Sequence, residues 1–236
     1  MSQTTPVWCV VPAAGVGKRF GSAVPKQYLP LHGQTVCEHT LQRLLQVESI
    51  QRIVVCLSSE DQTFTQLDVA RDARITTTPG GSERCHSVLH GLHALSLEAS
   101  DDDWVLVHDV ARPCIRPDDV RKLLHQVQTE NAIGGILANP VRDTMKRSNA
   151  HRHIIDTVSR DHLWHALTPQ LFPLGLLRDA IESALADNAI VTDEASAIER
   201  MGYQPLLVEG HPDNIKITHP QDLPLAALFI HQQETA

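Results

Sequence analysis

The chain has little positive charge for its length. Its 236 residues carry 20 Lys and Arg against 28 Asp and Glu, a formal net charge of -8 at pH 7. Surfaces that bind nucleic acid normally present a basic stripe, so this balance predicts no nucleic-acid partner, while it still permits a local cationic pocket. A signal-peptide pattern and a long uncharged apolar run are also lacking. Their absence predicts a cytoplasmic protein without a membrane partner.

Closely spaced cysteines are lacking too. The chain has five cysteines and no Cys-x-x-Cys pair: Cys9, Cys37, Cys56, Cys85 and Cys114. Cys9 and Cys56 fall inside apolar runs, which is typical of small buried thiols in a reducing compartment. A Gly-x-Ser-x-Gly motif is absent as well, so nothing supports acyl transfer through a nucleophile elbow.

Apolar runs and amphipathic segments alternate along most of the chain. The patterns predict strands and helices in turn: strands at 7–11, 53–57, 104–107, 133–137 and 214–218, and helices at 88–97 and 120–127, the latter with a start signal at 117–119. Such alternation is typical of an α/β protein with a doubly wound, mainly parallel sheet. The length suits one domain that spans residues 1–236.

A loop rich in glycine and cations follows the first predicted strand. It runs from Pro12 to Leu29, and its small residues let a phosphate or a base approach the main chain closely. It is no P-loop, because Arg19 follows Lys18 where a hydroxyl residue should stand. It lacks the third glycine of a dinucleotide fingerprint as well. With Lys26 also in reach, we interpret the loop as a polyphosphate cradle.

Polar clusters follow other predicted strands at equivalent ends. They are the turn at 80–87, the segment 108–113 and the segment 142–144. In doubly wound sheets ligands bind outside the carboxyl ends of the strands, so these clusters predict one shared site. Asp109 would contact a ribose or a divalent cation such as Mg²⁺ there, since Mg²⁺ prefers one or two carboxylates plus phosphate oxygens. Its structural alternative is a loop or helix cap.

Three other features have both a functional and a structural interpretation. Thr192 could bind a ligand or simply cap the helix that begins nearby. Lys216 could be a site residue or a solvated side chain. The polar segment 141–161 breaks the alternation, and we interpret it as an extended arm, with a mobile surface loop as the alternative.

Three histidines share one helical stripe, as metal ligands can: His86, His90 and His93. An apolar stripe lies roughly opposite them, so we expect the histidines to face solvent and not to form a structural zinc site.

Seven motifs, in order, give a more specific indication. They are PAAGVGKRFGSAVPKQYLPL, GGSERCHSV, VHDVARP, PVRDTMK, TPQLF, TDEAS and NIKIT, and they extend from residue 11 to residue 218. In these seven motifs and in their order, the chain resembles the 2-C-methyl-D-erythritol 4-phosphate cytidylyltransferase family. The resemblance implies a Rossmann-like nucleotidyltransferase fold with a protruding β-arm. It also implies transfer of CMP from CTP to methylerythritol phosphate, with release of pyrophosphate and with Mg²⁺ as the cofactor.

The resemblance also implies roles for individual residues. The implied catalytic residues are Arg19, Lys26, Arg160 and Lys216. The implied nucleotide-binding residues are Pro12, Ala13, Ala14, Gly15, Gly17, Gly81, Ser87 and Asp109, of which Asp109 is also the candidate metal ligand beside the CTP phosphates. The implied acceptor-binding residues are Arg112, Thr144, Thr168 and Thr192. The arm would embrace a second subunit, so that Thr144 and Arg160 complete the partner's site in a homodimer.

Two alternatives remain on the sequence alone. The glycine loop cannot select the acceptor, so a cytidylyltransferase for another polyol phosphate, such as ribitol 5-phosphate, is the nearest alternative. A non-catalytic nucleotide-binding protein on the same fold is the other. The joint presence of Arg19, Lys26, Asp109, Arg160 and Lys216 disfavours it.

Overall fold

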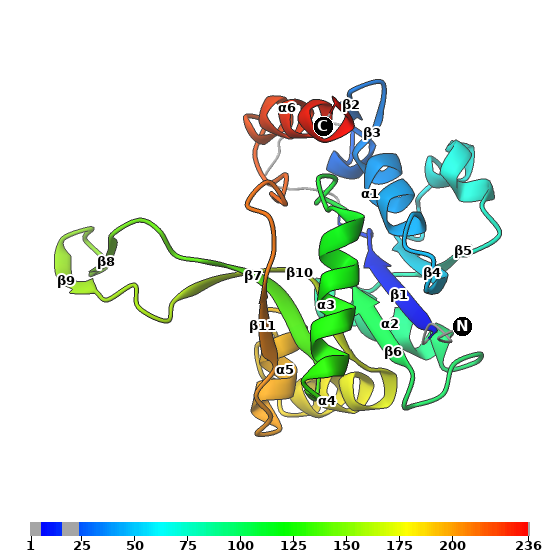
Figure 1. Ribbon diagram of the computed structural model, residues 1–236. Helices are drawn as coiled ribbons and strands as arrows, with labels where there is room; N and C mark the ends of the chain where they lie inside the picture. Colours follow the sequence, from blue (N-terminus) through cyan, green and yellow to red (C-terminus); the bar gives the residue numbers. More distant parts are fainter. Residues whose placement is uncertain (1–5, 16–23, 236) are drawn as a thin grey trace.

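A seven-stranded sheet forms the centre of the computed structural model, which describes residues 6–15 and 24–235 (Figure 1). Its strand order is β11-β7-β10-β6-β1-β4-β5. The strands are β1 (Val7–Pro12), β4 (Ile50–Leu57), β5 (Ile75–Pro79), β6 (Trp104–Val107), β7 (Gly135–Pro140), β10 (Trp164–Pro173) and β11 (Leu206–Glu209). β10 runs antiparallel to β6 and β7, whereas the other paired neighbours are parallel. The predicted mainly parallel sheet is therefore confirmed.

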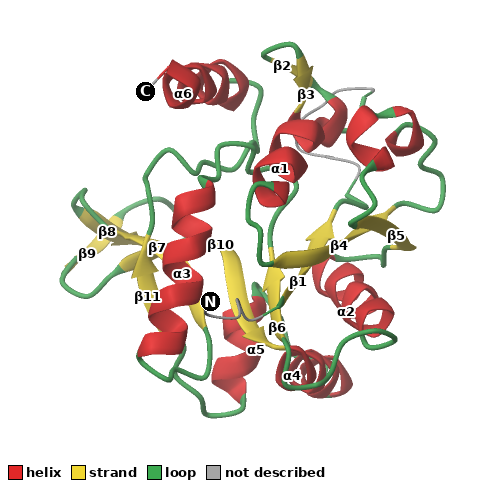
Figure 2. Cartoon of the chain, turned by 45° about the vertical axis from the view of Figure 1, so that its right-hand side comes forward, coloured by secondary structure: helices red, strands yellow, loops and turns green. Residues whose placement is uncertain are grey.

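Helices cover both faces of this sheet (Figure 2). Successive residues of a strand point to opposite faces, so Cys9 and Val11 of β1 pack on one side and Val10 on the other. The first side carries α1 (Val36–Leu45) and α3 (Pro117–Thr129). The second carries α2 (Arg84–Leu95), α4 (Leu174–Ala186) and α5 (Glu194–Arg200). This two-sided cover is the predicted doubly wound arrangement.

The C-terminal helix α6 (Asp222–Thr235) forms a third, smaller apolar cluster with the hairpin of β2 (Pro30–Leu31) and β3 (Gln34–Thr35). Ile217, fully buried, belongs to this cluster. Short 3-10 turns complete the described elements: η1 (Lys26–Tyr28), η2 (Phe64–Gln66) and η3 (Asp68–Arg71). The cluster thereby anchors the chain around Ile217 beside the main sheet.

A two-stranded arm leaves the body between β7 and β10 and projects far from it (Figure 1). Its antiparallel strands are β8 (Met145–Ser148) and β9 (Ile154–Val158). Two large apolar side chains on it, Ile154 and Ile155, are about two-thirds exposed, at 65% and 63%. The arm expected at 141–161 is thus a protruding β-arm.

Three predictions about local structure need correction. The segment 214–218 is a loop and not a strand, because Ile217 donates its N–H to the carbonyl of Ala111 in another loop. Its alternating pattern arises because the isoleucines pack toward α6. Asp193, and not Thr192, caps α5: its carboxylate accepts the N–H of Ser196, whose hydroxyl bonds back to the cap. The strand expected at 133–137 begins two residues later, at the start of β7.

All five cysteines are buried and free, as their positions in apolar runs predicted for two of them. No helix within residues 6–15 and 24–235 has the length and apolar character needed to cross a membrane.

Candidate functional site

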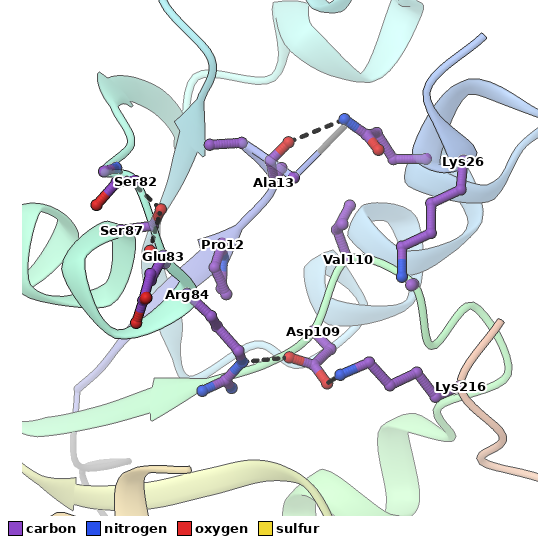
Figure 3. A pocket seen from close by; sticks show the side chains of 15 residues that line it. Pro12, Ala13, Lys26, Ser82, Glu83, Arg84, Ser87, Asp109, Val110 and Lys216 are labelled. Carbon is purple, nitrogen blue, oxygen red and sulfur yellow. Dashed lines mark hydrogen bonds and ion pairs between the residues drawn. The ribbon is translucent and has the colours of Figure 1, made fainter. Parts of the chain in front are cut away.

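A cavity of about 240 Å³ lies where the loops after β1, β5 and β6 meet (Figure 3). Nine of the predicted site residues line it: Pro12, Ala13, Ala14, Gly15, Lys26, Gly81, Ser87, Asp109 and Lys216. The predictions for Gly17, Lys18 and Arg19 fall outside the described residues. Segments that are far apart in the sequence therefore build one site at this edge of the sheet, as the strand-end rule predicts.

The first glycine loop and the turn after β5 lie against each other. A Cβ added to Gly80 would lie 2.4 Å from the Cβ of Ala14, so only glycine allows this close approach. Gln27 secures the first loop through a hydrogen bond of 2.9 Å from Nε2 to the carbonyl of Ala13. Residues 12–15 and the turn after β5 thus form a wall of backbone on one side of the cavity.

Ser87 holds the second loop together from the first turn of α2. Its hydroxyl accepts the N–H of Gly81 at 3.0 Å and donates to the carbonyl of Glu83 at 3.2 Å. The side chain is almost fully buried. Ser87 therefore sets the shape of the loop that lines the cavity.

Asp109, directly after β6, is the centre of the site's charge. Its Oδ1 accepts from Nε of Arg84 at 2.7 Å, and its Oδ2 lies 2.8 Å from Nζ of Lys216 (Figure 3). The same Oδ2 lies 3.6 Å from Nε of Arg112. Burial alone would raise the pKa of Asp109, but the charges of these three cations outweigh it and hold the pKa far below the usual range. Asp109 is therefore ionised at pH 7.

A buried ion pair with Glu194 fixes Arg84 in turn. Nη1 and Nη2 of Arg84 donate to the two carboxylate oxygens of Glu194 at 2.5 Å and 3.0 Å, and Glu194 is 1% exposed. Burial would lower the pKa of Arg84, yet the charges of Glu194 and Asp109 raise it. Our sequence reasoning missed both residues. Both stand inside quoted motifs, but no spacing rule pairs residues 110 positions apart.

Thr168 and His108 form a second buried unit beside Asp109. The hydroxyl of Thr168 accepts the N–H of Asp109 at 3.1 Å and lies 3.0 Å from Nδ1 of His108, whose Nε2 lies 3.3 Å from the carbonyl of Arg112. Burial lowers the pKa of His108 to about 4, so the ring is neutral at pH 7. A neutral ring can accept from Thr168 through Nδ1 and donate from Nε2. Thr168 is thus inside the wall of the site.

A second hollow, of about 380 Å³, adjoins the first. Arg112 and Lys216 line it together with Arg142, Asp143 and His165. Lys216 is common to both hollows, so it stands at their junction.

The remaining predicted residues line neither hollow. Thr144 and Arg160 lie at the base of the arm, where Arg160 donates to the carbonyl of Arg142. Thr192 is exposed beside the start of α5. Within residues 6–15 and 24–235 a single chain therefore does not bring these three to the lining of either cavity, and Thr168 contributes only from behind the wall, through Asp109.

Comparisons with known proteins agree on one family. The family model described as 2-C-methyl-D-erythritol 4-phosphate cytidylyltransferase matches residues 7–232. The enzyme of that name from Photorhabdus laumondii is 51% identical over 229 residues, 95% of this chain and 94% of its own length. That from Tolumonas auensis is 52% identical over 225 residues, 95% of this chain and 96% of its own.

Solved structures give the same result. The cytidylyltransferase of that name from Francisella tularensis superposes with a TM-score of 0.82 at 35% identity, covering 95% of this chain and 100% of that one. A crystal structure of a 4-diphosphocytidyl-2C-methyl-D-erythritol synthase also superposes with a TM-score of 0.82, at 36% identity, and covers 96% of this chain and 99% of that one.

The ion pair of Glu194 and Arg84 predicts a stability effect. In Glu194→Gln the partner charge is lost while the shape is kept, so the partly buried Arg84 loses the fully buried one of its two carboxylate partners. We expect the free energy of unfolding, measured by urea denaturation, to fall by about 3 kcal/mol. The matched control is Glu182→Gln, whose exposed pair with His93 should contribute less than about 1 kcal/mol. Equal effects of the two substitutions would contradict this account.

His108 predicts a dependence of stability on pH. Its folded pKa of about 4 lies below the unfolded value of 6.5, so the unfolded chain binds the extra proton first as the pH falls. The free energy of unfolding therefore has its full contribution from the neutral His108 above pH 6.5. It decreases as the pH falls from 6.5 toward 4, by on the order of 3 kcal/mol. Urea unfolding of His108→Asn between pH 7 and pH 4 should show a correspondingly smaller loss than the unsubstituted chain. If the free energies of unfolding of the two chains fall in parallel between pH 7 and pH 4, His108 is not the source of this pH dependence.

Proposed function

The chain belongs to the 2-C-methyl-D-erythritol 4-phosphate cytidylyltransferase family, and on that premise we propose how its residues divide the work of the reaction. The enzyme transfers CMP from CTP to 2-C-methyl-D-erythritol 4-phosphate and forms 4-diphosphocytidyl-2-C-methyl-D-erythritol and pyrophosphate. The observation that carries the proposal is the position of Lys216, which lines both hollows. A residue at that junction can contact both reacting phosphates.

The first hollow takes the nucleotide in this proposal. Its backbone wall at Ala13–Gly15, with Gly81 and Ser87, offers close main-chain approach to cytosine and ribose. Lys26, from the far side of the same hollow, neutralises the triphosphate. Arg19 would act with it, as the family resemblance implies.

The second hollow takes the acceptor. Arg112 and Lys216 supply the positive charge that a sugar phosphate needs, and both contact Asp109. Asp109 holds the two cations in place between nucleotide and acceptor. Thr168 supports Asp109 from behind through its hydroxyl. The acceptor's phosphate thereby approaches the first hollow along a wall of fixed cations.

The proposed mechanism requires no general base. A phosphate monoester has a second pKa of about 6, so the attacking group is mostly dianionic at pH 7. The difficulty is repulsion between two anions that must approach in line, and fixed cations lower that barrier. The ring of His108 is buried and engaged with Thr168 and Arg112, so it is placed for structure and not for proton transfer.

We propose Mg²⁺ as the cofactor, bound mainly through the triphosphate. Both oxygens of Asp109 are occupied by Arg84 and Lys216, so this carboxylate fits as an anchor for the cations and at most as an outer contact of the metal. Mg²⁺ commonly keeps waters and phosphate oxygens around it, which suits a site with one such carboxylate. When bound, the ion supplies further neutralisation of the phosphate charge.

We further propose that the arm completes the acceptor site of a second subunit. Thr144 and Arg160 lie on the arm side and line neither hollow of their own chain. The arm also exposes Ile154 and Ile155 on an element that stands clear of the body (Figure 1). A two-fold dimer that buries these side chains would carry Thr144 and Arg160 to the partner's hollow, since such an interface is self-complementary.

Substitution of Lys26 tests the role of the nucleotide hollow. We expect Lys26→Ala to lower kcat for pyrophosphate release, with CTP, Mg²⁺ and methylerythritol phosphate, by about 100-fold or more. The KM for CTP should change far less, because the contact strengthens in the transition state. Lys122→Ala, at an exposed lysine on α3, is the control. A rise in the KM for CTP at unchanged kcat would contradict this role of Lys26.

Replacing methylerythritol phosphate by ribitol 5-phosphate in the same assay of the unsubstituted chain tests the alternative acceptor.

Mixed subunits test the shared site. Lys26→Ala and Arg160→Ala chains, each nearly inactive alone, are unfolded together and refolded. If Arg160 serves the partner's site, each mixed dimer contains one intact site, and we expect about a quarter of the unsubstituted activity. Sedimentation and mass spectrometry of differently tagged chains verify the mixed dimers. Verified mixed dimers without recovered activity would show that the site is not shared.

A further inference from the structure

Three metal-ligating side chains converge at the start of α2. They belong to Glu83, Cys85 and His86, and one ligand atom of each lies within 4.8 Å of the other two. Among the described residues this is the group of His, Cys, Asp and Glu side chains whose spacing suits a metal ion. We propose that this cluster, the Glu83 triad, is a binding site for Zn²⁺ at the rim of the nucleotide cavity.

The ligand types select the metal. A thiolate and an imidazole favour Zn²⁺ over Mg²⁺, which prefers oxygen ligands alone. Zn²⁺ also binds carboxylate oxygen, so all three side chains suit it. The site is therefore chemically distinct from the Mg²⁺ that we propose on the triphosphate.

The separations are close to those of a metal-bound set. Tetrahedral Zn²⁺ places its protein ligand atoms about 3.3–3.6 Å apart. Sγ of Cys85 and Oε2 of Glu83 lie 4.0 Å apart. A small rotation of Glu83, which is exposed, brings them together, while Cys85 is buried in the first turn of the helix. Three protein ligands leave the fourth position open to water, as in many zinc sites.

The neighbouring contacts preorganise the triad. The hydroxyl of Ser82 lies 3.2 Å from Nδ1 of His86 and orients its ring. Glu83 is the residue before α2, and its carbonyl accepts from Ser87, so its backbone is held as well. When Zn²⁺ binds, the Cys85 thiol releases its proton to solvent and the thiolate takes a place on the metal.

Two of the three histidines of the predicted stripe, His90 and His93, do not contribute ligands to the triad. His90 contacts the carbonyl of Pro79, and His93 contacts Glu182 on α4. Both are exposed, as we expected. His86 instead meets a carboxylate and a cysteine that lie beside it on one turn, a pairing that the helical stripe did not indicate.

Occupancy of the triad would affect the nucleotide cavity. Glu83 and Ser82 line that cavity, and Ser87 contacts the Glu83 carbonyl (Figure 3). A metal that draws the Glu83 side chain toward Cys85 changes one wall of the cavity. This consequence rests on the proposed function, and we expect micromolar Zn²⁺ to lower CTP turnover at saturating Mg²⁺.

The binding test uses Co²⁺ as a spectroscopic probe and needs no catalysis. Co²⁺ added to the metal-free full chain without nucleotide should produce a thiolate-to-cobalt charge-transfer band, with one ion per chain, that Zn²⁺ abolishes. Cys85→Ser should eliminate the band, and His86→Ala should weaken Co²⁺ binding more than about 10-fold, since even outer contacts of a metal cost that much. Two substitutions outside the triad serve as controls: Cys114→Ser at a buried cysteine and His90→Ala at an exposed histidine. Both variants should retain the charge-transfer band.

The outcomes separate this proposal from the proposed function. A band that persists in Cys85→Ser, or no band in the unsubstituted chain, overturns the site even if the chain is fully active with CTP. If the band behaves as expected, the Zn²⁺ concentration that halves turnover should rise more than about 10-fold in Cys85→Ser. An unchanged inhibitory concentration in that variant would overturn the link to the cavity. Circular dichroism of each variant confirms that it is folded.

Discussion

The structure of the site depends on one buried anion, the carboxylate of Asp109. It faces Arg84, Arg112 and Lys216, which come from three separate segments of the chain. A buried carboxylate is unfavourable by itself, so Asp109 depends on these cations, of which Arg112 is itself buried while Arg84 and Lys216 are partly exposed. This requirement brings the loops after β5 and β6 and the segment around Lys216 to one place. The geometry of the site follows from it.

The site brings charged side chains together and, among its described residues, does not present a general acid or base. The chain as a whole is acidic, yet Lys26, Arg84 and Lys216 meet at the cavity where β1, β5 and β6 end. Glu194 extends the network to α5 and so links the wall of the first hollow to the segment that follows Thr192. Preorganised cations suit a reaction between two anions, because they need not be reoriented as the phosphates approach. The fold thus holds Lys26 and Lys216 in place before either substrate binds.

Local patterns predicted the elements that are buried or strongly capped. β1, β4 and β6 agree with apolar runs, and α3 begins at Pro117 as its start signal indicated. The patterns failed where contacts outside the segment decide the outcome. Residues 214–218 alternate like a strand but pack toward α6 and bond to Ala111. Asp193 takes the cap of α5 because its carboxylate reaches the N–H of Ser196.

Four of the seven described strands of the sheet (β1, β4, β6 and β7), the glycine loop and the family were predictable from the sequence, because apolar periodicity and contiguous motifs are local properties. It also indicated that Lys26 and Asp109 share a site, through the rule that ligands bind at the strand ends, whereas Lys216 was added to them only by the family resemblance. The pairing of Arg84 with Glu194, and the position of Glu83 and Cys85 beside His86, became visible only in the folded chain. Side-chain direction and pairing depend on how the whole chain packs, and no local pattern records them.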